Sequence, residues 1–67
     1  MKIKLNQQDI KIPTEKTTLS DILKQSRLPL SRIAVRVNSI VVPKVQWQSK
    51  VILENDNIET ITLVSGG

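Results

Sequence analysis

The residues of this 67-residue chain whose type and position most suggest chemistry are its two glycines, Gly66 and Gly67, which are its last two residues. Glycine has no Cβ atom, so a Gly-Gly segment can enter a passage too narrow for other residues. The chain contains no cysteine and no histidine, which excludes thiol nucleophiles, serine–histidine relays and the usual zinc sites. The group left to react is the terminal carboxylate of Gly67. The alternative is a frayed terminus whose composition has no function.

A carboxylate resists nucleophiles because it is anionic and its leaving group is poor. A partner must therefore activate it, most simply as an acyl-adenylate made from ATP, after which a sulfur, thiol or amine nucleophile can displace AMP. None of these steps needs a nucleophile, a base or a metal ligand in the chain itself. We therefore expect a substrate and carrier, not an enzyme, with Val64, Ser65, Gly66 and Gly67 as a flexible tail that enters the partner's active site.

Composition limits the other functions. The length allows one small domain, residues 1–67. The ten basic residues are dispersed and Trp47 is the single aromatic residue, so nucleic-acid binding is not expected. Glu54 and Asp56 are interpreted as a solvated turn instead of a metal or proton-transfer site. With no signal peptide, membrane segment or cysteine, a cytoplasmic or organelle-stromal location is the default.

The first third of the sequence predicts a hairpin and a helix. Residues 2–6 and 9–12 alternate polar and apolar side chains, which predicts two antiparallel strands with Ile3, Leu5, Ile10 and Ile12 facing inward. Thr18 and Asp21 form an N-cap signature for a helix whose buried stripe is Leu19, Ile22 and Leu23. Pro29 is expected to end that helix.

The rest of the sequence returns to strand periodicity. Residues 33–37 and 40–42 predict two strands joined by a tight turn at residues 38–39, with Pro43 ending the second strand. Val45 and Trp47 are expected to pack over an edge of the core. A short strand at residues 51–53 and a turn at 54–57 then lead into a last strand, residues 58–64.

This order of elements predicts one α+β domain with a mixed four- to five-stranded sheet and a single helix packed across one face. A right-handed crossover brings a late strand parallel to the first strand. The ubiquitin-like β-grasp fold satisfies that order with no element left over. The alternative architecture is a small five-stranded barrel, which normally has less helix and more glycine.

Two segments of the chain resemble a known family. Residues 37–47, which read V-N-S-I-V-V-P-K-V-Q-W, resemble the V-N-x-x-x-V-P-[RK]-x-x-W segment of the ThiS family, the sulfur carriers of thiamine biosynthesis, and residues 64–67 resemble its V-x-G-G ending. The acidic turn after Leu53 is also similar, although Asn55 replaces the usual glycine. Because asparagine tolerates positive φ, Asn55 is predicted to adopt the left-handed conformation. Trp47 is interpreted as a residue that packs in the core or at its edge, in preference to a residue that contacts a partner.

The resemblance implies a set of partners and cosubstrates. A ThiF-like, E1-like adenylyltransferase activates Gly67 with ATP and magnesium, neither of which this chain binds itself. Sulfur from a cysteine-derived persulfide, such as that of a cysteine desulfurase, then converts the carboxylate into a thiocarboxylate. A ThiG-like thiazole synthase takes the sulfur. The Gly-Gly ending alone also fits a molybdopterin-type sulfur carrier or a ubiquitin-like protein modifier, and a β-grasp binding module is the alternative from another class.

The last strand has two possible orientations. Burial of Ile61 and Leu63 would leave Thr60 and Thr62 in water, whereas burial of Ile58 turns Ile61 and Leu63 outward on the open face of the sheet. Ubiquitin-like folds present an exposed aliphatic patch at this strand, and the resemblance therefore favours the outward orientation. We expect Ile61 and Leu63 to form a partner-docking patch beside the tail.

Overall fold

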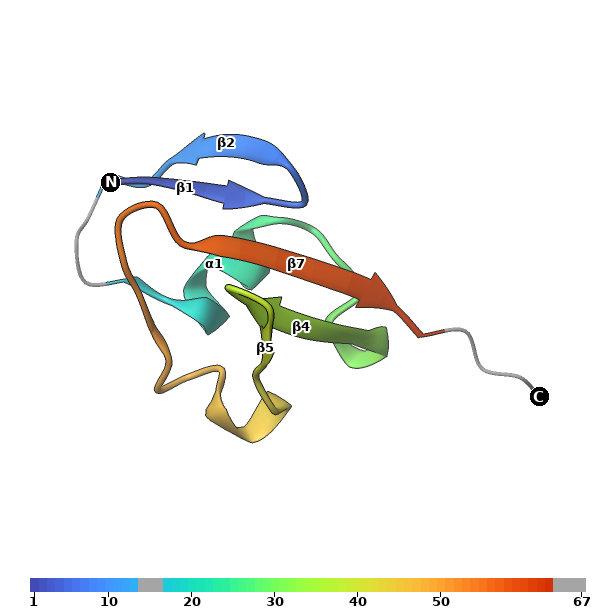
Figure 1. Cartoon of the computed structure of the whole chain (residues 1–67). Coiled ribbons are helices and arrows are strands. Elements are labelled where there is room, and N and C mark those ends of the chain that lie inside the picture. Colours follow the sequence, from blue (N-terminus) through green and yellow to red (C-terminus); the bar gives the residue numbers. More distant parts are fainter. Residues whose placement is uncertain (14–16, 64–67) are drawn as a thin grey trace.

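The last strand of the described residues lies in the middle of its sheet. In the computed structural model, which describes residues 1–13 and 17–63, five strands form a mixed sheet in the order β2-β1-β7-β4-β5 (Figure 1). These strands are β1 (Lys2–Leu5), β2 (Gln8–Lys11), β4 (Ile33–Val37), β5 (Ile40–Val41) and β7 (Asn57–Thr62). β1 and β7 are parallel and the other pairs are antiparallel. The predicted mixed sheet with parallel first and last strands is confirmed.

The N-terminal hairpin follows the predicted alternation. β1 and β2 pair with Ile3 opposite Ile10, around a two-residue turn at Asn6 and Gln7, both of which have positive φ. Such primed turns match the twist of the flanking strands. Ile3, Leu5 and Ile12 are buried, while Ile10 is half-buried. The hairpin therefore has one apolar face, as predicted, with Ile10 at its outer margin.

The helix α1 (Leu19–Gln25) begins where the sequence predicts and ends earlier. Thr18 and Asp21 form a reciprocal capping box, and Leu19, Ile22 and Leu23 are buried. The expectation that Pro29 ends the helix is wrong. Ser26 caps the last turn with its N–H and hydroxyl on the carbonyl of Leu23, and Arg27 has a φ of 60°. A left-handed residue after the C-cap stops a helix without any proline.

A two-stranded sheet that the sequence did not reveal anchors the start of the helix. β3 (Thr17–Thr18) pairs antiparallel with β6 (Val51–Ile52), outside the five-stranded sheet. The predicted strand at 51–53 therefore exists, but its assignment to the single mixed sheet is wrong. The physical reason is length, because two residues are too few for a recognisable alternation at β3.

Trp47 closes the core below β4 and β5. It is 5% exposed, and its indole N–H donates to the carbonyl of Val42 at 2.9 Å. It follows a 3₁₀ turn, Lys44–Gln46, in which residues three apart share a side. Val45 therefore points away from Trp47 and is 88% exposed. The expectation that Val45 packs over the core is wrong, whereas that for Trp47 is confirmed.

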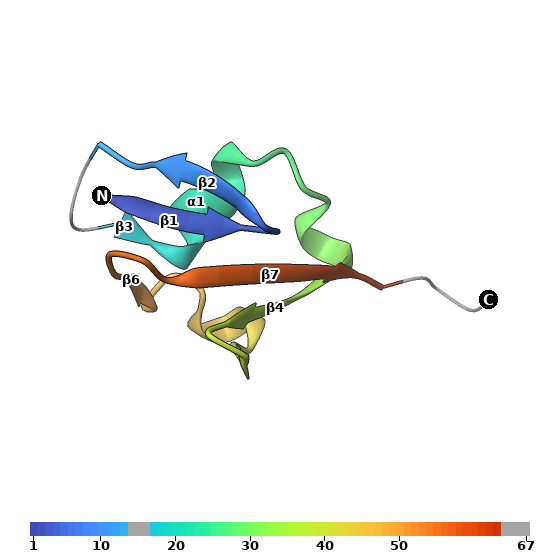
Figure 2. The ribbon, with the colours of Figure 1, turned by 45° about the horizontal axis from the view of Figure 1, so that its top comes forward.

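The core lies between the helix and one face of the five-stranded sheet, and the opposite face is open (Figure 2). Leu19, Leu23, Ile52 and Ile58 have no exposed surface. Burial of such aliphatic side chains contributes roughly 1.5–3 kcal/mol each. The buried hydrophobic residues are Ile3, Leu5, Ile12, Leu19, Ile22, Leu23, Ile33, Val35, Val37, Val42, Trp47, Ile52 and Ile58.

The expectation that Asp56 is solvated is wrong, because its carboxylate is buried and ties two turns together through hydrogen bonds. Its oxygens accept hydrogen bonds from the backbone N–H of Leu53 at 2.8 Å and from the side-chain amide of Asn38 at 2.9 Å. The amide oxygen of Asn38 in turn accepts from the backbone N–H of Asn57 at 3.0 Å. Asp56 thus joins the turn before β7 to the turn between β4 and β5, and the start of β7 is fixed from both sides.

The left-handed conformation predicted for Asn55 is confirmed, with a φ of 68°. Asn55→Gly is expected to leave the free energy of unfolding nearly unchanged, because glycine adopts this φ freely. Asn55→Val is expected to lower it by ~1 kcal/mol or more, since a β-branched residue is strained at this φ. Urea unfolding of both variants measures the difference, and equal stabilities would contradict the assignment.

Asp56→Ala is expected to lower the free energy of unfolding by about 1–3 kcal/mol, because it leaves the Leu53 N–H and the Asn38 amide without their acceptor. Asp9→Ala, measured at low protein concentration, is the matched control, since it removes an exposed carboxylate from a strand. Thermal and urea unfolding compare the two. A loss no larger than that of the control would show that water replaces both hydrogen bonds at no cost.

Candidate functional site

β7 leads directly to the glycines and is held along both sides. On one side, β4 pairs with β7 from Val37 opposite Ile58 to Ile33 opposite Thr62. The ladder continues past the strand, where the N–H of Leu63 donates to the carbonyl of Arg32. On the other side, β1 pairs with Asn57 and Ile58. The chain is therefore positioned by hydrogen bonds up to Leu63.

The structure resolves the orientation of this strand. Ile58 is fully buried, whereas Ile61 is 50% and Leu63 is 55% exposed. Burial of Ile58 sets the alternation, and Asn57, Glu59 and Ile61 therefore face the open side of the sheet. The predicted outward orientation of Ile61 agrees with this exposure. The two aliphatic side chains lie at the end of β7 from which the chain continues to the glycines.

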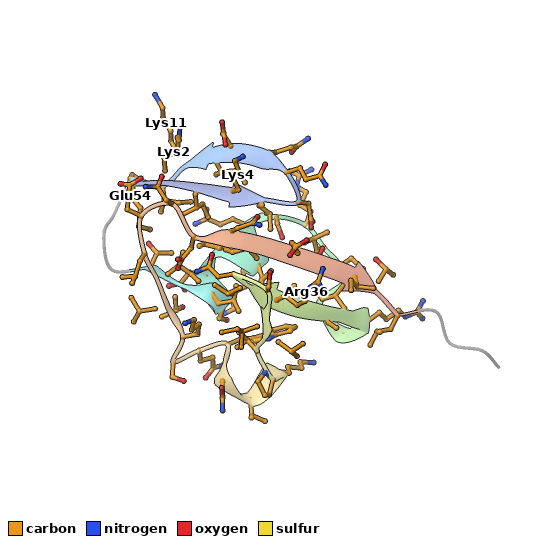
Figure 3. The ribbon with its side chains drawn as sticks, viewed as in Figure 1. Lys2, Lys4, Lys11, Arg36 and Glu54 are labelled. Carbon is orange, nitrogen blue, oxygen red and sulfur yellow. The ribbon has the colours of Figure 1, made fainter. Side chains whose placement is uncertain are left out.

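An ion pair lies beside these aliphatic residues on the open face. Arg36 on β4 stands opposite Glu59 on β7, and a guanidinium nitrogen lies 3.2 Å from a carboxylate oxygen. The side chains of Arg36 and Glu59 are 40% and 32% exposed, so the pair adds little stability. Val41 lies opposite Arg36 on β5 and is 62% exposed. Figure 3 shows Arg36 on the opposite side of β7 from Lys4.

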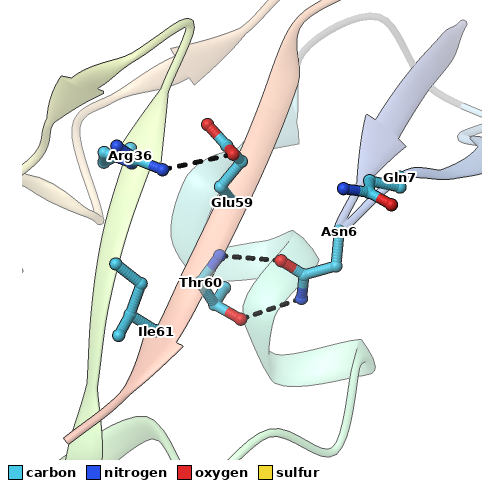
Figure 4. A pocket seen from close by; sticks show the side chains of 6 residues that line it. All are labelled: Asn6, Gln7, Arg36, Glu59, Thr60 and Ile61. Carbon is cyan, nitrogen blue, oxygen red and sulfur yellow. Dashed lines mark hydrogen bonds and ion pairs between the residues drawn. The ribbon is translucent and has the colours of Figure 1, made fainter.

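The hairpin turn clamps the middle of β7. The side-chain oxygen of Asn6 accepts from the backbone N–H of Thr60 at 2.8 Å, and its NH₂ donates to the Thr60 hydroxyl at 2.8 Å (Figure 4). Its backbone N–H also donates to the carbonyl of Ile58 at 2.9 Å. The Asn6 side chain thus continues the β1–β7 ladder beyond the last residue of β1. Sequence reasoning missed this role, because the contact joins residues 54 positions apart.

A shallow hollow of about 250 Å³ lies between the hairpin turn and β7. Figure 4 shows the side chains that line it, which are Asn6, Gln7, Arg36, Glu59, Thr60 and Ile61. Its walls combine an ion pair, amides and one aliphatic side chain. Such a mixed, open surface suits contact with a protein better than enclosure of a small molecule. The hollow therefore extends the exposed surface around Ile61 toward the hairpin.

Other site types have limited support in the part of the chain that the structure describes. Within residues 1–13 and 17–63, no three Asp, Glu, His or Cys side chains gather into a possible metal site. No described helix is long and apolar enough to cross a membrane. The predicted tail, Val64, Ser65, Gly66 and Gly67, lies outside the described residues. Its role stays a prediction, as does partner docking at Ile61 and Leu63.

The family model of the ThiS family matches residues 3–67. Among solved structures, the chain is similar to the crystal structure of the thiamine biosynthesis protein ThiS from Geobacter metallireducens, with a TM-score of 0.88, 16% sequence identity and complete coverage of both chains. At this identity the likeness shows the fold, and it confirms the expected ubiquitin-like β-grasp. A comparison with curated proteins found no match. Because the family model covers all but the first two residues, the chain belongs to the ThiS family of sulfur carrier proteins in thiamine biosynthesis.

Proposed function

We propose that this chain carries sulfur as a thiocarboxylate on Gly67 and donates it for thiazole formation. The observation that carries the proposal is the match of the family model through Gly67. It is supported by the position of β7, which is paired on both sides, and by the exposed Ile61 and Leu63 at the end of that strand and directly after it. The fold holds this strand, and the chemistry takes place on the residues that follow it.

The proposed cycle has two chemical stages. In the first, an oxygen of the Gly67 carboxylate attacks the α-phosphorus of ATP, and pyrophosphate leaves. In the second, the terminal sulfur of a persulfide attacks the acyl carbon and displaces AMP. A thiol then reduces the sulfur–sulfur bond, which leaves the thiocarboxylate on Gly67 and a disulfide on the donor side. ATP and magnesium are assigned to the activating partner, so this chain is a substrate and carrier in every step.

Three partners follow from this cycle. A ThiF-like adenylyltransferase activates the carboxylate, a cysteine desulfurase supplies the persulfide, and a ThiG-like thiazole synthase accepts the sulfur. The first and last of these must each admit the same glycines. One surface near the end of β7 can serve both, because the two partners act on the chain at different times.

Chain length restricts where those partners dock. An extended chain spans at most about 3.3–3.6 Å per residue, so the four residues after Leu63 reach no further than about 14 Å. A partner must therefore bring Leu63 within that distance of its reacting group. Leu63 and the nearby Ile61 are both exposed, so a partner that brings Leu63 this close to its reacting group can also contact them. Exposed aliphatic side chains are suitable anchors for an interface. We therefore place partner docking at these two residues.

Deletion of Gly67, or addition of one residue after it, is expected to abolish acyl-adenylate formation with the cognate adenylyltransferase. The reason is that the reacting carboxylate is then missing or displaced. ATP–pyrophosphate exchange measures this step, and urea unfolding is expected to show no change. Lys24→Ala, on the exposed face of α1, is the control that keeps the exchange. Normal exchange with either tail variant would refute the assignment of Gly67.

Ile61→Ala is expected to weaken binding to the adenylyltransferase by ~1 kcal/mol or more and to leave stability almost unchanged. Leu53→Ala is the matched control, because Leu53 is 62% exposed and precedes the opposite end of β7. Calorimetric titration measures binding and thermal unfolding measures stability. A stability loss of ~2 kcal/mol or more would show that Ile61 belongs to the core.

Intact mass of the protein isolated from its native cell tests the carrier function directly. A fraction of the chains is expected to show the increase that replacement of one oxygen atom by sulfur produces. This increase is expected to disappear when the adenylyltransferase gene is deleted. Isopeptide adducts on lysines of other proteins, with no thiocarboxylate, would identify a protein modifier instead.

A further inference from the structure

The outer edge of β2 is an unpaired sheet edge within the part of the chain that the structure describes. The N–H of Ile12 donates to the carbonyl of Met1 at 2.6 Å, and the amino group of Met1 donates to the carbonyl of Ile12 at 2.8 Å. The main-chain N–H and C=O groups of Ile12 therefore point toward the side of β1. Because hydrogen-bonded and non-bonded pairs alternate in an antiparallel ladder, Gln8 and Ile10 also face β1. The N–H and C=O groups of Asp9 and Lys11 therefore point outward from the sheet and can accept another strand.

The two faces beside this edge differ in character. On the helix side, a groove of about 250 Å³ runs between β2 and α1, with Ile10 and Ile22 among the side chains in its walls. On the open side, Asp9 and Lys11 are exposed. Lys4 stands opposite Asp9, and Lys2 stands opposite Lys11. Figure 3 shows Lys2 and Lys11 side by side at the outer end of the hairpin.

These side chains define the sequence of a complementary strand. A strand that pairs antiparallel with β2 meets Lys11 first, then Ile10 and then Asp9. The best match is an acidic residue opposite Lys11, an aliphatic residue opposite Ile10 and a basic residue opposite Asp9. Along its own direction this strand reads acidic, aliphatic, basic. That is the order of Asp9, Ile10 and Lys11 in β2 itself.

We propose that two copies of this chain pair through their β2 edges, with a two-fold axis at Ile10. Asp9 of each copy then stands opposite Lys11 of the second copy, and each such pair exchanges two main-chain hydrogen bonds. The side chains of Asp9 and Lys11 meet on the open face as ion pairs. The two Ile10 side chains meet on the helix side, at the margin of the groove. The contact is self-complementary, as a two-fold interface requires.

The proposed pair is compatible with the carrier function and does not depend on it. β1 separates β2 from β7 in the sheet, so Ile61 and Leu63 stay exposed in both copies. β2 has four residues, and a contact of this length gives a weak, concentration-dependent dimer. An edge strand whose only charged residues are lysines resists pairing. In the proposed dimer, by contrast, Lys11 of each copy stands opposite Asp9 of the second copy.

Charge reversal tests the pairing on the full chain. Sedimentation equilibrium at low salt, up to about 1 mM protein, measures the dimer dissociation constant. Lys11→Asp and Asp9→Lys are each expected to weaken the dimer about tenfold or more, because each change places like charges opposite one another. The double variant Asp9→Lys/Lys11→Asp restores opposite charges and is expected to return within about threefold of the unmodified chain.

Two controls and one local measurement make the test specific. Lys24→Asp has the same charge change as Lys11→Asp, and it lies on the exposed face of α1, so the dissociation constant is expected to stay unchanged. Amide hydrogen exchange of Asp9 and Lys11 is expected to slow as protein concentration rises. Urea unfolding at low concentration verifies that every variant remains folded.

Three results would overturn the proposal. The first is an unmodified chain that stays monomeric up to about 1 mM. The second is a dimer that the single reversals weaken and the double variant does not restore. The third is a dimer that the β2 variants leave intact and that Val41→Lys dissociates, because this would place the contact at β5, the other edge of the sheet.

Discussion

The parallel pairing of β1 with β7 is the contact on which the rest of the arrangement depends. It brings the start of the described chain beside its last strand and leaves room for β4 on the other side. Leu5 and Ile58, which stand opposite each other in this pairing, are both buried. A central strand is difficult to displace, because its removal breaks two ladders at once. The fold therefore places a central strand, paired on both sides, directly before the residues that we propose to react.

The pairing also determines which side chains remain available for recognition. Ile58 belongs to the core, so period two turns Glu59 and Ile61 to the open face. The same alternation on β4 presents Arg36 beside Glu59. A shift of β7 by one residue would turn Glu59 and Ile61 toward the core, away from Arg36, and would expose Ile58. The Asn6 side chain and the Asp56 carboxylate protect this register, since each bonds to β7 or to the turn that precedes it.

Much of the fold could be predicted from the sequence, because its patterns are local. The hairpin, the capping box at Thr18 and the alternation of residues 33–37 each depend on neighbouring residues. The errors lie where the deciding contact is distant or short. β3 is visible only through its pairing with β6, and Val45 follows the geometry of a 3₁₀ turn. The end of the helix at Arg27 could not be predicted from the sequence, because arginine seldom adopts the positive φ that it has here.

The candidate site was predictable in a different way. The glycines and the aliphatic residues of β7 were found from composition and periodicity, whereas the Asn6–Thr60 clamp needed three-dimensional contacts. Periodicity left two orientations for β7, which the burial of Ile58 and the exposure of Ile61 distinguish. The kind of chemistry that the chain can take part in could thus be inferred from its residue types. The surface around Ile61 could not, because it is formed by β4, β7 and the turn between β1 and β2, which are distant in the sequence.

The turns of this protein use side chains where many proteins use glycine. Six described residues have positive φ and none is glycine; they are Asn6, Gln7, Arg27, Asn38, Ser39 and Asn55. Residues with a Cβ atom restrict the unfolded ensemble, so they reduce the entropy that this small domain loses on folding. The freedom that glycine gives to a backbone is reserved for positions 66 and 67. The turns of the described domain thus restrict the backbone up to the segment that we propose to react, and a partner that binds the domain would also determine where that segment begins.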